Sequence, residues 1–491
     1  MAIDQGTTGT TVAIVDQSGF IVDKVNNEYP QIYPQPGWVE HNPEDIWHSV
    51  TKTIGEVLKK SGINPKEIAT IGITNQRETS LIWSRYTNQT IYNAIVWQCR
   101  RTTDFCNKLK KSGKGKIINK KTGLVLDPYF SATKFRWILD HVKGARKLAA
   151  TGELACGTID SFLLWRLTDG EVHATDVSNA SRTMLMNIDS GEWDAELLKI
   201  FSVPKNMLPE IRPSSGEFGC TLNVPGLPDG IPISGIAGDQ QAALFGQACF
   251  AAGDAKCTFG TGSFLLMNTG SKRVKSKSGI LTTVAWQLKN DKKLTYALEG
   301  GAFICGAAVQ WLRDGMKMIS SSSGVESLAQ EVSDSGGVEF VPALTGLGAP
   351  YWDAEARGMI CGLTRGSTRA HLARATLDAM ALQNLDILSA MQKDLGKKLK
   401  SLKVDGGATS NNLLMQLQAD YLGQSISRPK MIESTVLGAA YLAGLGAGFW
   451  KNQSEIKKVW QLDQDFKPKI SSKARIARVK SWHAAISRAR S

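Results

Sequence analysis

Asp4-Gln5-Gly6-Thr7-Thr8-Gly9-Thr10-Thr11 runs directly into the apolar residues 12–15 near the start of the chain. Midway along the chain, Thr258-Phe259-Gly260-Thr261-Gly262-Ser263 runs directly into residues 264–267. Glycines allow a tight turn, so each stretch predicts a strand, a hairpin and a return strand. The hydroxyl and amide donors at such a tip form a concave group that suits a phosphate. Two hairpins, each opening half of the chain, predict a duplicated architecture with a cleft between the halves.

Strand and helix patterns alternate between and after these hairpins, as an α/β fold requires. Residues 68–74, 94–97, 233–237 and 402–404 read as buried strands, and residues 43–59 and 133–142 as helices. Residues 218–231 are rich in Gly and Pro and predict a connection without regular structure. Since 491 residues exceed what one hydrophobic core usually supports, we predict two domains, residues 1–247 and 248–491.

Composition places the chain among globular enzymes. Hydrophobic residues make up 42% and charged residues 21%, which argues against disorder. The first residues lack the basic and apolar regions of a secretory signal. The eight cysteines show no CxxC pair and no disulfide framework, so a reducing compartment, the cytoplasm, is predicted.

Two segments could suggest a membrane or a nucleic acid as partner. Residues 434–450 carry no charge, but they are too few for a membrane span and rich in Gly and Ala, which favours a closely packed helix. The net charge of +13 is concentrated in residues 108–121 and in the tail after Lys467. Neither run contains the interleaved aromatic residues or motif of a nucleic-acid site, so both predict solvated faces, with a general attraction for polyanions such as ATP.

Three routes to nucleotide binding can be compared from the motifs. No GxxxxGK[ST] is present, which excludes a P-loop, and the glycines from Gly444 to Gly448 neither follow a strand nor give GxGxxG. The remaining features are the two hairpins and acidic residues at strand ends, as in actin-like ATPases.

Several strings are similar to the FGGY family of carbohydrate kinases over essentially the whole chain. One family signature matches residues 129–137 (YFSATKFRW), and a second runs from Gly358 through Gly362 and His371 to Asp378. Shorter strings resemble the members that phosphorylate glycerol rather than those acting on longer sugars: NQRE at 75–78, WQCRR at 97–101, GDQQ at 238–241 and LGAPYW at 347–352.

The resemblance implies two RNase-H-like domains facing a catalytic cleft, with ATP and a polyol as partners and Mg²⁺ as cofactor. Residues expected to bind glycerol, by polar contacts or as apolar walls, are Arg77, Glu78, Trp97, Tyr129, Asp239, Gln240 and Phe264. Without the resemblance, Arg77-Glu78 would read as a surface pair and the two aromatic walls, Trp97 and Phe264, as core residues. Arg77 and Glu78 are adjacent, so both can reach one ligand only if the chain turns there.

Asp239 is the predicted general base, because a carboxylate at a strand end can accept the hydroxyl proton during phosphoryl transfer. Its alternative reading is an N-cap for the next helix. Asp4 is expected to act on Mg²⁺ through water, and its alternative is a turn-forming residue. The residues expected to bind ATP are Thr7, Thr8, Gly9, Thr261, Gly262, Gly306, Gln310, Gly407 and Asn411, although Gly306 and Gly407 could instead serve packing.

One position departs from the family pattern. Thr11 stands where many relatives have an arginine, so one cationic phosphate contact is absent. Two alternatives to a glycerol-phosphorylating enzyme stay open: a family member for another sugar or polyol, and an actin-like nucleotide switch, since a fold does not fix function. The sequence also allows a homodimer or homotetramer.

Overall fold

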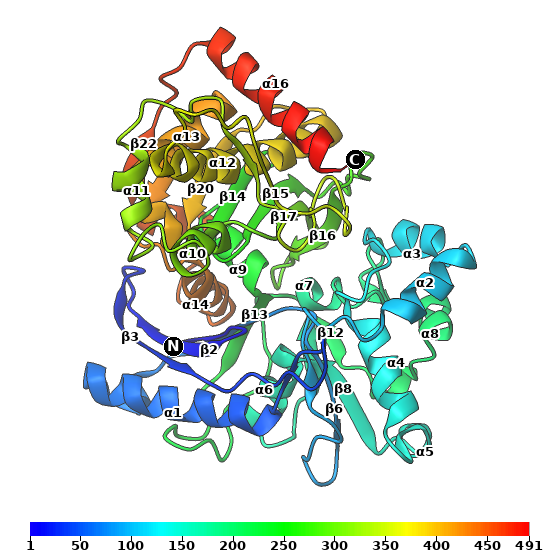
Figure 1. The fold of residues 1–491 in the computed structure, drawn as a ribbon. Coiled ribbons are helices and arrows are strands. Elements are labelled where there is room, and N and C mark those ends of the chain that lie inside the picture. The colour runs from blue at the N-terminus through cyan, green and yellow to red at the C-terminus, as the bar shows by residue number, and fades with distance from the viewer. Residues whose placement is uncertain (491) are drawn as a thin grey trace.

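The computed structural model describes residues 1–490 and contains two mixed sheets with the same central strand order (Figure 1). The first sheet has the order β13 (Ile233–Gly238), β5 (Ile71–Asn75), β1 (Ala2–Gln5), β2 (Gly9–Val15) and β3 (Ile21–Glu28). The second has the order β16 (Leu281–Trp286), β17 (Thr295–Ala302), β15 (Ser263–Gly270), β14 (Asp254–Phe259), β20 (Ser401–Asp405), β21 (Ile426–Pro429) and β22 (Leu462–Phe466).

Each sheet begins with the hairpin that the sequence predicts. In both, the first two strands are antiparallel and the first strand also pairs in parallel with a later one, β5 or β20. A Cβ at Gly9 would lie 2.7 Å from the Asn27 oxygen of β3, and one at Gly262 would lie 2.6 Å from the Ala302 oxygen of β17. The two glycines are therefore required at equivalent places, where each hairpin packs on the third strand of its sheet.

Further strands and helices surround the first sheet. A smaller sheet has the order β4 (Glu40–His41), β7 (Ala94–Ile95), β6 (Ser80–Ser84) and β8 (Leu154–Thr158), and two-stranded pairs join β9 (Ala174–Asp176) to β12 (Glu210–Arg212) and β10 (Met186–Asn187) to β11 (Glu192–Trp193). The helices of this half are α1 (Pro43–Ser61), α2 (Thr103–Lys111), α3 (Lys114–Thr122), α4 (Ser131–His141), α5 (Ala145–Ala150), α6 (Ile159–Leu167), α7 (Val177–Ala180), α8 (Ala195–Phe201) and α9 (Asp239–Gly246).

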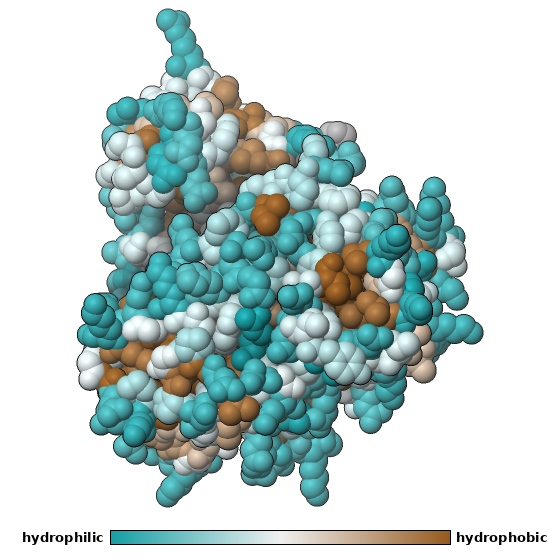
Figure 2. Space-filling view, turned by 90° about the horizontal axis from the view of Figure 1, so that it is seen from below, coloured by the Kyte–Doolittle hydropathy of each residue, from teal (hydrophilic) through white to brown (hydrophobic). Residues whose placement is uncertain are grey.

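Besides its main sheet, the second half contains a separate two-stranded sheet of β18 (Glu339–Val341) and β19 (Met359–Cys361). Its helices are α10 (Gly306–Asp314), α11 (Gly324–Ala329), α12 (Arg369–Leu395), α13 (Asn412–Leu422), α14 (Ser434–Gly446), α15 (Gln453–Val459) and α16 (Ser472–Ala489). Each half has its own large buried hydrophobic cluster. Over the face seen in Figure 2, hydrophilic side chains cover most of the surface and hydrophobic ones gather in separate small groups.

Local signals explain where the predicted elements begin and end. Helix α1 starts after Asn42, whose side chain accepts the Glu44 amide, and ends at Gly62 in the left-handed conformation. Its buried face includes Ile46, Val50 and Ile54. Residues 218–231 contain neither a helix nor a strand, as predicted. The predicted strands at 68–74 and 94–97 are shorter in the structure: β5 begins only at Ile71, and β7 ends at Ile95.

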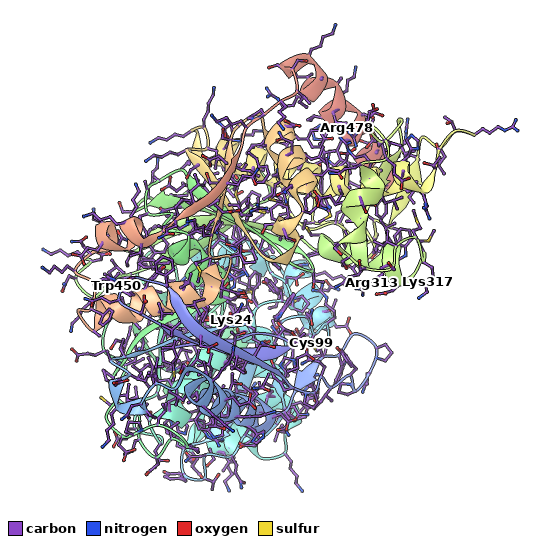
Figure 3. The ribbon with its side chains drawn as sticks, turned by 90° about the vertical axis from the view of Figure 1, so that its left-hand side faces the viewer. Lys24, Cys99, Arg313, Lys317, Trp450 and Arg478 are labelled. Carbon is purple, nitrogen blue, oxygen red and sulfur yellow. The ribbon has the colours of Figure 1, made fainter. Side chains whose placement is uncertain are left out.

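Helix α14 belongs to the second half of the sequence but packs on the first sheet (Figure 1). A Cβ at Gly438 would collide with the Ala242 oxygen of α9, and one at Gly72 with the Ala439 oxygen. At one end of α14, Glu433 pairs with Lys24 of β3, and beyond the other end Trp450 donates a 3.3 Å hydrogen bond to the Gln17 oxygen; Figure 3 labels Lys24 and Trp450 on this side. The small residues thus serve close packing, as the sequence predicts, and no helix within residues 1–490 is long and apolar enough to span a membrane.

Candidate active site

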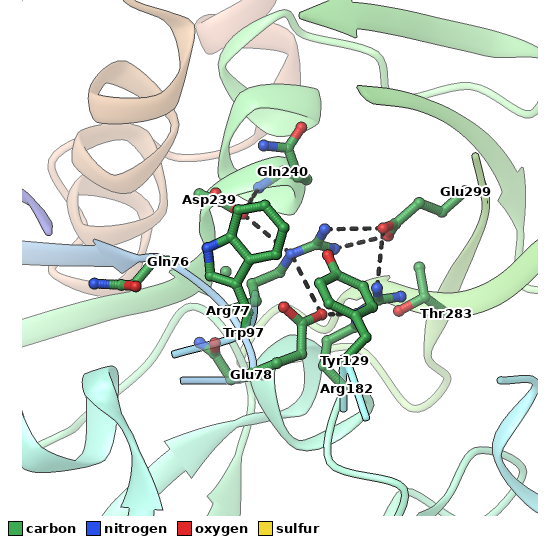
Figure 4. A network of polar contacts seen from close by, with 12 residues as sticks. Gln76, Arg77, Glu78, Trp97, Tyr129, Arg182, Asp239, Gln240, Thr283 and Glu299 are labelled. Atoms are coloured by element: carbon green, nitrogen blue, oxygen red, sulfur yellow. Dashed lines mark hydrogen bonds and ion pairs between the residues drawn. The ribbon is translucent and has the colours of Figure 1, made fainter. Parts of the chain in front are cut away.

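The chain turns sharply directly after β5, where Arg77 and Glu78 lie. Glu78 has a φ of 62°, which is rare for a residue with a side chain and marks a strained position. Two hydroxyls hold its carbonyl oxygen, that of Ser80 at 2.8 Å and that of Ser131 at 3.1 Å. Because of this turn, Arg77 and Glu78 point into the same group of side chains (Figure 4). The chain therefore makes the turn that Arg77 and Glu78 need if both are to reach one ligand.

Arg77 lies at the centre of a buried polar cluster. Its Nη1 and Nη2 atoms donate to the two carboxylate oxygens of Glu299 at 2.7 and 2.8 Å, and its Nε lies 3.1 Å from Asp239 Oδ1. The Arg77 side chain is only 2% exposed, whereas that of Asp239 is 30% exposed. The cluster therefore opens to solvent at Asp239, where a substrate hydroxyl could reach it.

Two members of the cluster, Arg182 and Glu299, were not predicted from the sequence. Arg182 Nε donates to Glu78 Oε1 at 2.6 Å and its Nη2 to Glu299 Oε1 at 3.0 Å. Arg182 follows the short helix α7, and Glu299 lies on β17 of the second sheet. The available signal was weak: Glu299 is a lone charge in the otherwise uncharged strand TYALEGGA, which indicates a buried ion pair.

The two buried glutamates differ in their electrostatics. Burial raises the pKa of Glu299, but Arg182 and Arg77 outweigh burial and hold the pKa at about 2. Burial also raises the pKa of Glu78, and there Arg182 and Arg77 do not fully offset it. The difference follows from geometry, because Glu299 accepts three charged hydrogen bonds and Glu78 only one. Glu299 is thus the fixed anion of the cluster.

Trp97 and Tyr129 form the aromatic side of the site. Their ring centroids lie 5.6 Å apart in an edge-to-face arrangement. The Trp97 indole donates a 2.9 Å hydrogen bond to the hydroxyl of Thr7, at the tip of the first hairpin. The predicted apolar wall of the polyol site is therefore joined to the predicted phosphate hairpin.

Asp239 is the first residue of α9, and the N-cap position belongs to Gly238. The Asp239 carboxylate accepts the Gln240 amide at 2.7 Å and has Arg77 as its other partner. Asp239 therefore does not occupy the N-cap position, but its carboxylate accepts one amide of the first turn, so a helix-terminal role and the role of base are compatible. A partly exposed carboxylate held from two sides is well placed to accept a proton.

Two predicted substrate residues lie farther from the cluster. The Gln240 side chain points away from Arg77 (Figure 4), and its Oε1 accepts from the buried Lys256 of β14. Lys256 also donates to the Thr258 hydroxyl at 2.8 Å. Phe264 lies half-buried on β15, opposite Gly301 of β17. Among the described residues, no hydrogen bond joins either of these two side chains to the Arg77 cluster, and the main-chain amide of Gln240 is bound to Asp239.

The predicted ATP residues of the second half converge around the second hairpin. The amides of Cys305 and Ala307 donate to the Thr261 oxygen at 2.8 and 3.0 Å, and that of Gly306 to the Gly260 oxygen at 2.9 Å. A Cβ at Gly406 would lie 2.6 Å from the Phe259 oxygen, so the segment after β20 also packs on this hairpin. Among the predicted nucleotide contacts, exposed residues that can face a ligand are Thr8, Thr261, Gln310 and Gly407.

Two further predictions on the nucleotide side can be placed. Asn411 is the N-cap of α13 and accepts the Leu414 amide at 2.8 Å, so part of its side chain serves the helix. Thr11, where the family pattern has an arginine, lies on β2 and accepts a 2.9 Å hydrogen bond from Asn26.

Asp4 lies at the end of β1, and its carboxylate accepts no hydrogen bond from the described residues. Burial, followed by repulsion from Asp239 and Glu433, raises its pKa to about 8. A divalent cation would relieve this burial penalty and repulsion, so Asp4 fits the role of a metal ligand. Within residues 1–490, no group of three or more acidic, His or Cys residues is arranged to hold a metal ion.

Residues 1–246 match the N-terminal domain of the FGGY family of carbohydrate kinases, and residues 255–447 match its C-terminal domain. The chain belongs to this family. It is 62% identical to a glycerol kinase of Bdellovibrio bacteriovorus over 488 residues, covering 99% of this chain and 98% of the relative. It is 54% identical to glycerol kinase 2 of Thermotoga maritima, covering 99% and 98%.

The FGGY fold is also found in solved structures. The glycerol kinase of Plasmodium falciparum with ADP has a TM-score of 0.93 and 38% identity, covering 99% of this chain and 97% of that one. A xylulose kinase of Lactobacillus acidophilus, 24% identical, has a TM-score of 0.87 and covers 99% and 97%. The predicted two-domain α/β fold is thus confirmed, and kinases of this family generally need a divalent metal.

Proposed function

We propose that this FGGY kinase transfers the γ-phosphoryl group of ATP to a hydroxyl of glycerol, giving glycerol 3-phosphate. The observation that carries the proposal is the Arg77 cluster, which opens at Asp239 beside Trp97 and Tyr129. It offers a small polyol charged donors and acceptors next to an apolar wall, and such a mixture selects by size and by hydrogen bonding. The identity to relatives named glycerol kinase supports the same substrate.

Arg77 and Glu78 would bind two of the hydroxyls. Glu78 Oε1 is occupied by Arg182, while its Oε2 accepts no hydrogen bond from the described residues and is available to a hydroxyl. Tyr129 would hydrogen-bond another hydroxyl, and Trp97 would contact the carbon chain and limit its length. Gln240 and Phe264 remain predicted contacts, and Gln240 would have to turn from Lys256 to reach the ligand.

Asp239 would accept the proton of the reacting hydroxyl as the bond between oxygen and phosphorus forms. Phosphoryl transfer passes through a loose transition state, so the protein mainly positions the reactants and neutralises charge. The hairpin tips with Thr7, Thr8 and Gly9 and with Thr261 and Gly262 would hold the phosphates by amide and hydroxyl donors. Gly306, Gln310, Gly407 and Asn411 would contact the nucleoside.

We assign the divalent metal as Mg²⁺ and Asp4 as its ligand through water. When bound, it would supply positive charge to the phosphate oxygens. The cytoplasm remains the predicted compartment, in agreement with eight cysteines that are all free. A homodimer or homotetramer also remains a prediction.

A coupled assay of ADP release tests the proposed function. With ATP and Mg²⁺, we expect release that depends on glycerol and is weak with D-xylulose or gluconate. Faster release with either of those compounds would favour a kinase for another sugar. Release that no polyol changes would favour the nucleotide switch.

A further inference from the structure

Arg77, Glu78, Arg182 and Glu299 form a closed ring of ion pairs in the Arg77 cluster. Arg77 binds Glu299 through two hydrogen bonds, Arg182 binds both Glu299 and Glu78, and Arg77 Nε lies 3.9 Å from Glu78 Oε1. All four side chains are at most 3% exposed. Three of them come from the first half of the chain, and only Glu299 comes from the second.

Glu299 controls what Arg77 can do for a substrate. Its two oxygens fix both Nη atoms of Arg77 and so set the plane of the guanidinium. Without that carboxylate, the nearest anions left for Arg77 are Asp239 and Glu78. Arg77 would then occupy the acceptors that the polyol hydroxyls need.

Arg182 transmits the same constraint to Glu78. It holds Glu78 Oε1 and Glu299 Oε1 through two different nitrogens, which a lysine could not do from one point charge. Arg182 Nη1 is buried and has no hydrogen-bond partner among residues 1–490. A hydroxyl of the polyol or of water would satisfy that nitrogen.

The strand that carries Glu299 also touches the second hairpin. Glu299 pairs with Leu266 on β15, and three residues later Ala302 pairs with Ser263. Gly262, at the tip of the hairpin, packs directly on the Ala302 oxygen. The hairpin and Glu299 are therefore parts of one sheet. A displacement of that sheet moves Glu299 together with any ligand that the hairpin holds.

We propose that Glu299 is a positioning residue that completes the polyol site only when the second sheet lies against the first, so that nucleotide and polyol binding reinforce each other. This inference rests on the proposed function. The coupling is a free energy shared between the two ligands, so each should raise the affinity for the other by the same factor.

The experiment compares Glu299→Gln with wild type in the coupled assay and by calorimetry of glycerol binding, with and without a non-hydrolysable ATP analogue. We expect the KM for glycerol to rise about 10- to 100-fold, because charged hydrogen bonds are lost, while the affinity for the ATP analogue measured without glycerol changes by less than about threefold. We also expect the analogue to enhance glycerol binding in wild type and not in the variant.

Glu339→Gln is the matched control. Glu339 is another buried glutamate in a strand of the second half, paired with Arg478 of α16, which Figure 3 labels. We expect this variant to lose thermal stability and to keep the KM for glycerol within about twofold of wild type. Arg182→Lys keeps the charge but breaks the ring, so it should raise the KM for glycerol even if Glu299→Gln does not fold.

The outcomes separate the two proposals. Wild-type enzyme that shows no glycerol-dependent ADP release overturns the proposed function and this inference with it. If wild type is active, an unchanged glycerol KM in Glu299→Gln or Arg182→Lys overturns the inference alone. A rise of the same size in Glu339→Gln would also overturn it, because general destabilisation would then explain the effect.

Discussion

The first strands of the two sheets, β1 and β14, are equivalent in topology, and in each sheet a carboxylate and a threonine lie side by side on this strand and its parallel neighbour. The two residue types occupy reversed positions in the two sheets. In the first sheet Asp4 of β1 lies beside Thr74 of β5. In the second sheet Thr258 of β14 lies beside Asp405 of β20. The carboxylate thus lies on the hairpin strand β1 in the first sheet, but on the neighbouring strand β20 in the second.

The surroundings of the two carboxylates differ in kind. Asp405 accepts hydrogen bonds from Gln247 at 2.8 Å and from Ser434, so it ties α9 and α14 to the second sheet. Asp4 accepts none from the described residues, and burial with nearby negative charge raises its pKa. In the second sheet the carboxylate is satisfied by protein donors and joins neighbouring elements. In the first sheet it has no such donors, which is why we propose Asp4 as the metal ligand.

The largest expected effect concerns Asp239, the proposed general base in the first half. Asp239→Asn keeps the shape of the side chain but cannot accept the proton, so kcat should fall by roughly 10² to 10⁴ with glycerol still bound. Steady-state kinetics and calorimetry measure the two quantities. Asp405→Asn is the matched variant, and we expect it to lower the Tm while keeping most of the turnover.

A variant Asp239→Asn that retains more than about a tenth of the wild-type kcat would contradict its role as general base. If Asp405→Asn lost as much activity as Asp239→Asn at equal stability, the division between the two halves would be wrong.

A smaller effect, on the Mg²⁺ requirement, is expected from substitutions at the equivalent positions Asp4 and Thr258. Asp4→Asn removes the proposed metal ligand, so the Mg²⁺ concentration for half-maximal activity should rise by about tenfold or more. Thr258→Ser, at the equivalent position of the second sheet, should leave that concentration unchanged. Titration of Mg²⁺ at fixed ATP distinguishes them, and an equal Mg²⁺ requirement in wild type and Asp4→Asn would contradict the assignment.

The smallest effect concerns buried carboxylates away from the site. Asp160 in α6 accepts from the hydroxyls of Thr158 and Thr175 and has no cationic partner among the described residues, whereas Asp378 in α12 has Arg374 and Arg478 as partners. Burial raises the pKa of Asp160 from 3.8 to about 7, more than its hydrogen bonds lower it. Its protonated form stabilises the fold, fully so below about pH 4, and this stability is lost as the pH rises through about 7.

Asp160→Asn cannot ionise, so its Tm relative to wild type should increase by about 2–5 °C between about pH 5 and about pH 8. Differential scanning calorimetry at both pH values measures this. Asp378→Asn should lose stability at both pH values, because Arg374 loses its anion and Arg478 keeps only Glu339. A Tm difference for Asp160→Asn that does not change with pH would show that Asp160 ionises normally in the folded protein.

The hairpins and the strand-end acids could be predicted because they depend on local chemistry. Glycine spacing predicted both tips. The adjacency of Arg77 and Glu78 meant that both could reach one ligand only if the chain turned there, and Glu78 makes that turn with a positive φ. Arg182 and Glu299, the other two members of the ion-pair ring, could not be predicted from local sequence patterns. Glu299 is 222 residues from Arg77, and only the meeting of the two sheets makes them partners.

The orientation of Gln240 and the exact ends of β5 and β7 also depend on tertiary contacts. Gln240 turns to Lys256, a buried cation with no acidic partner within ion-pair distance among the described residues. The roles of the site residues stay predictions until the variants above are measured.

Helix α14 has a consequence for how the protein is made. The first sheet is complete once β13 has been synthesised, but α14, which packs on its strands β13, β5, β1 and β2, lies near the end of the chain. While the ribosome produces the whole second sheet, the glycine-lined surface around Gly72 stays exposed to water and to other nascent chains. The first half should therefore need a chaperone until α14 emerges, and a chain that stops before Ser434 should be degraded or aggregate.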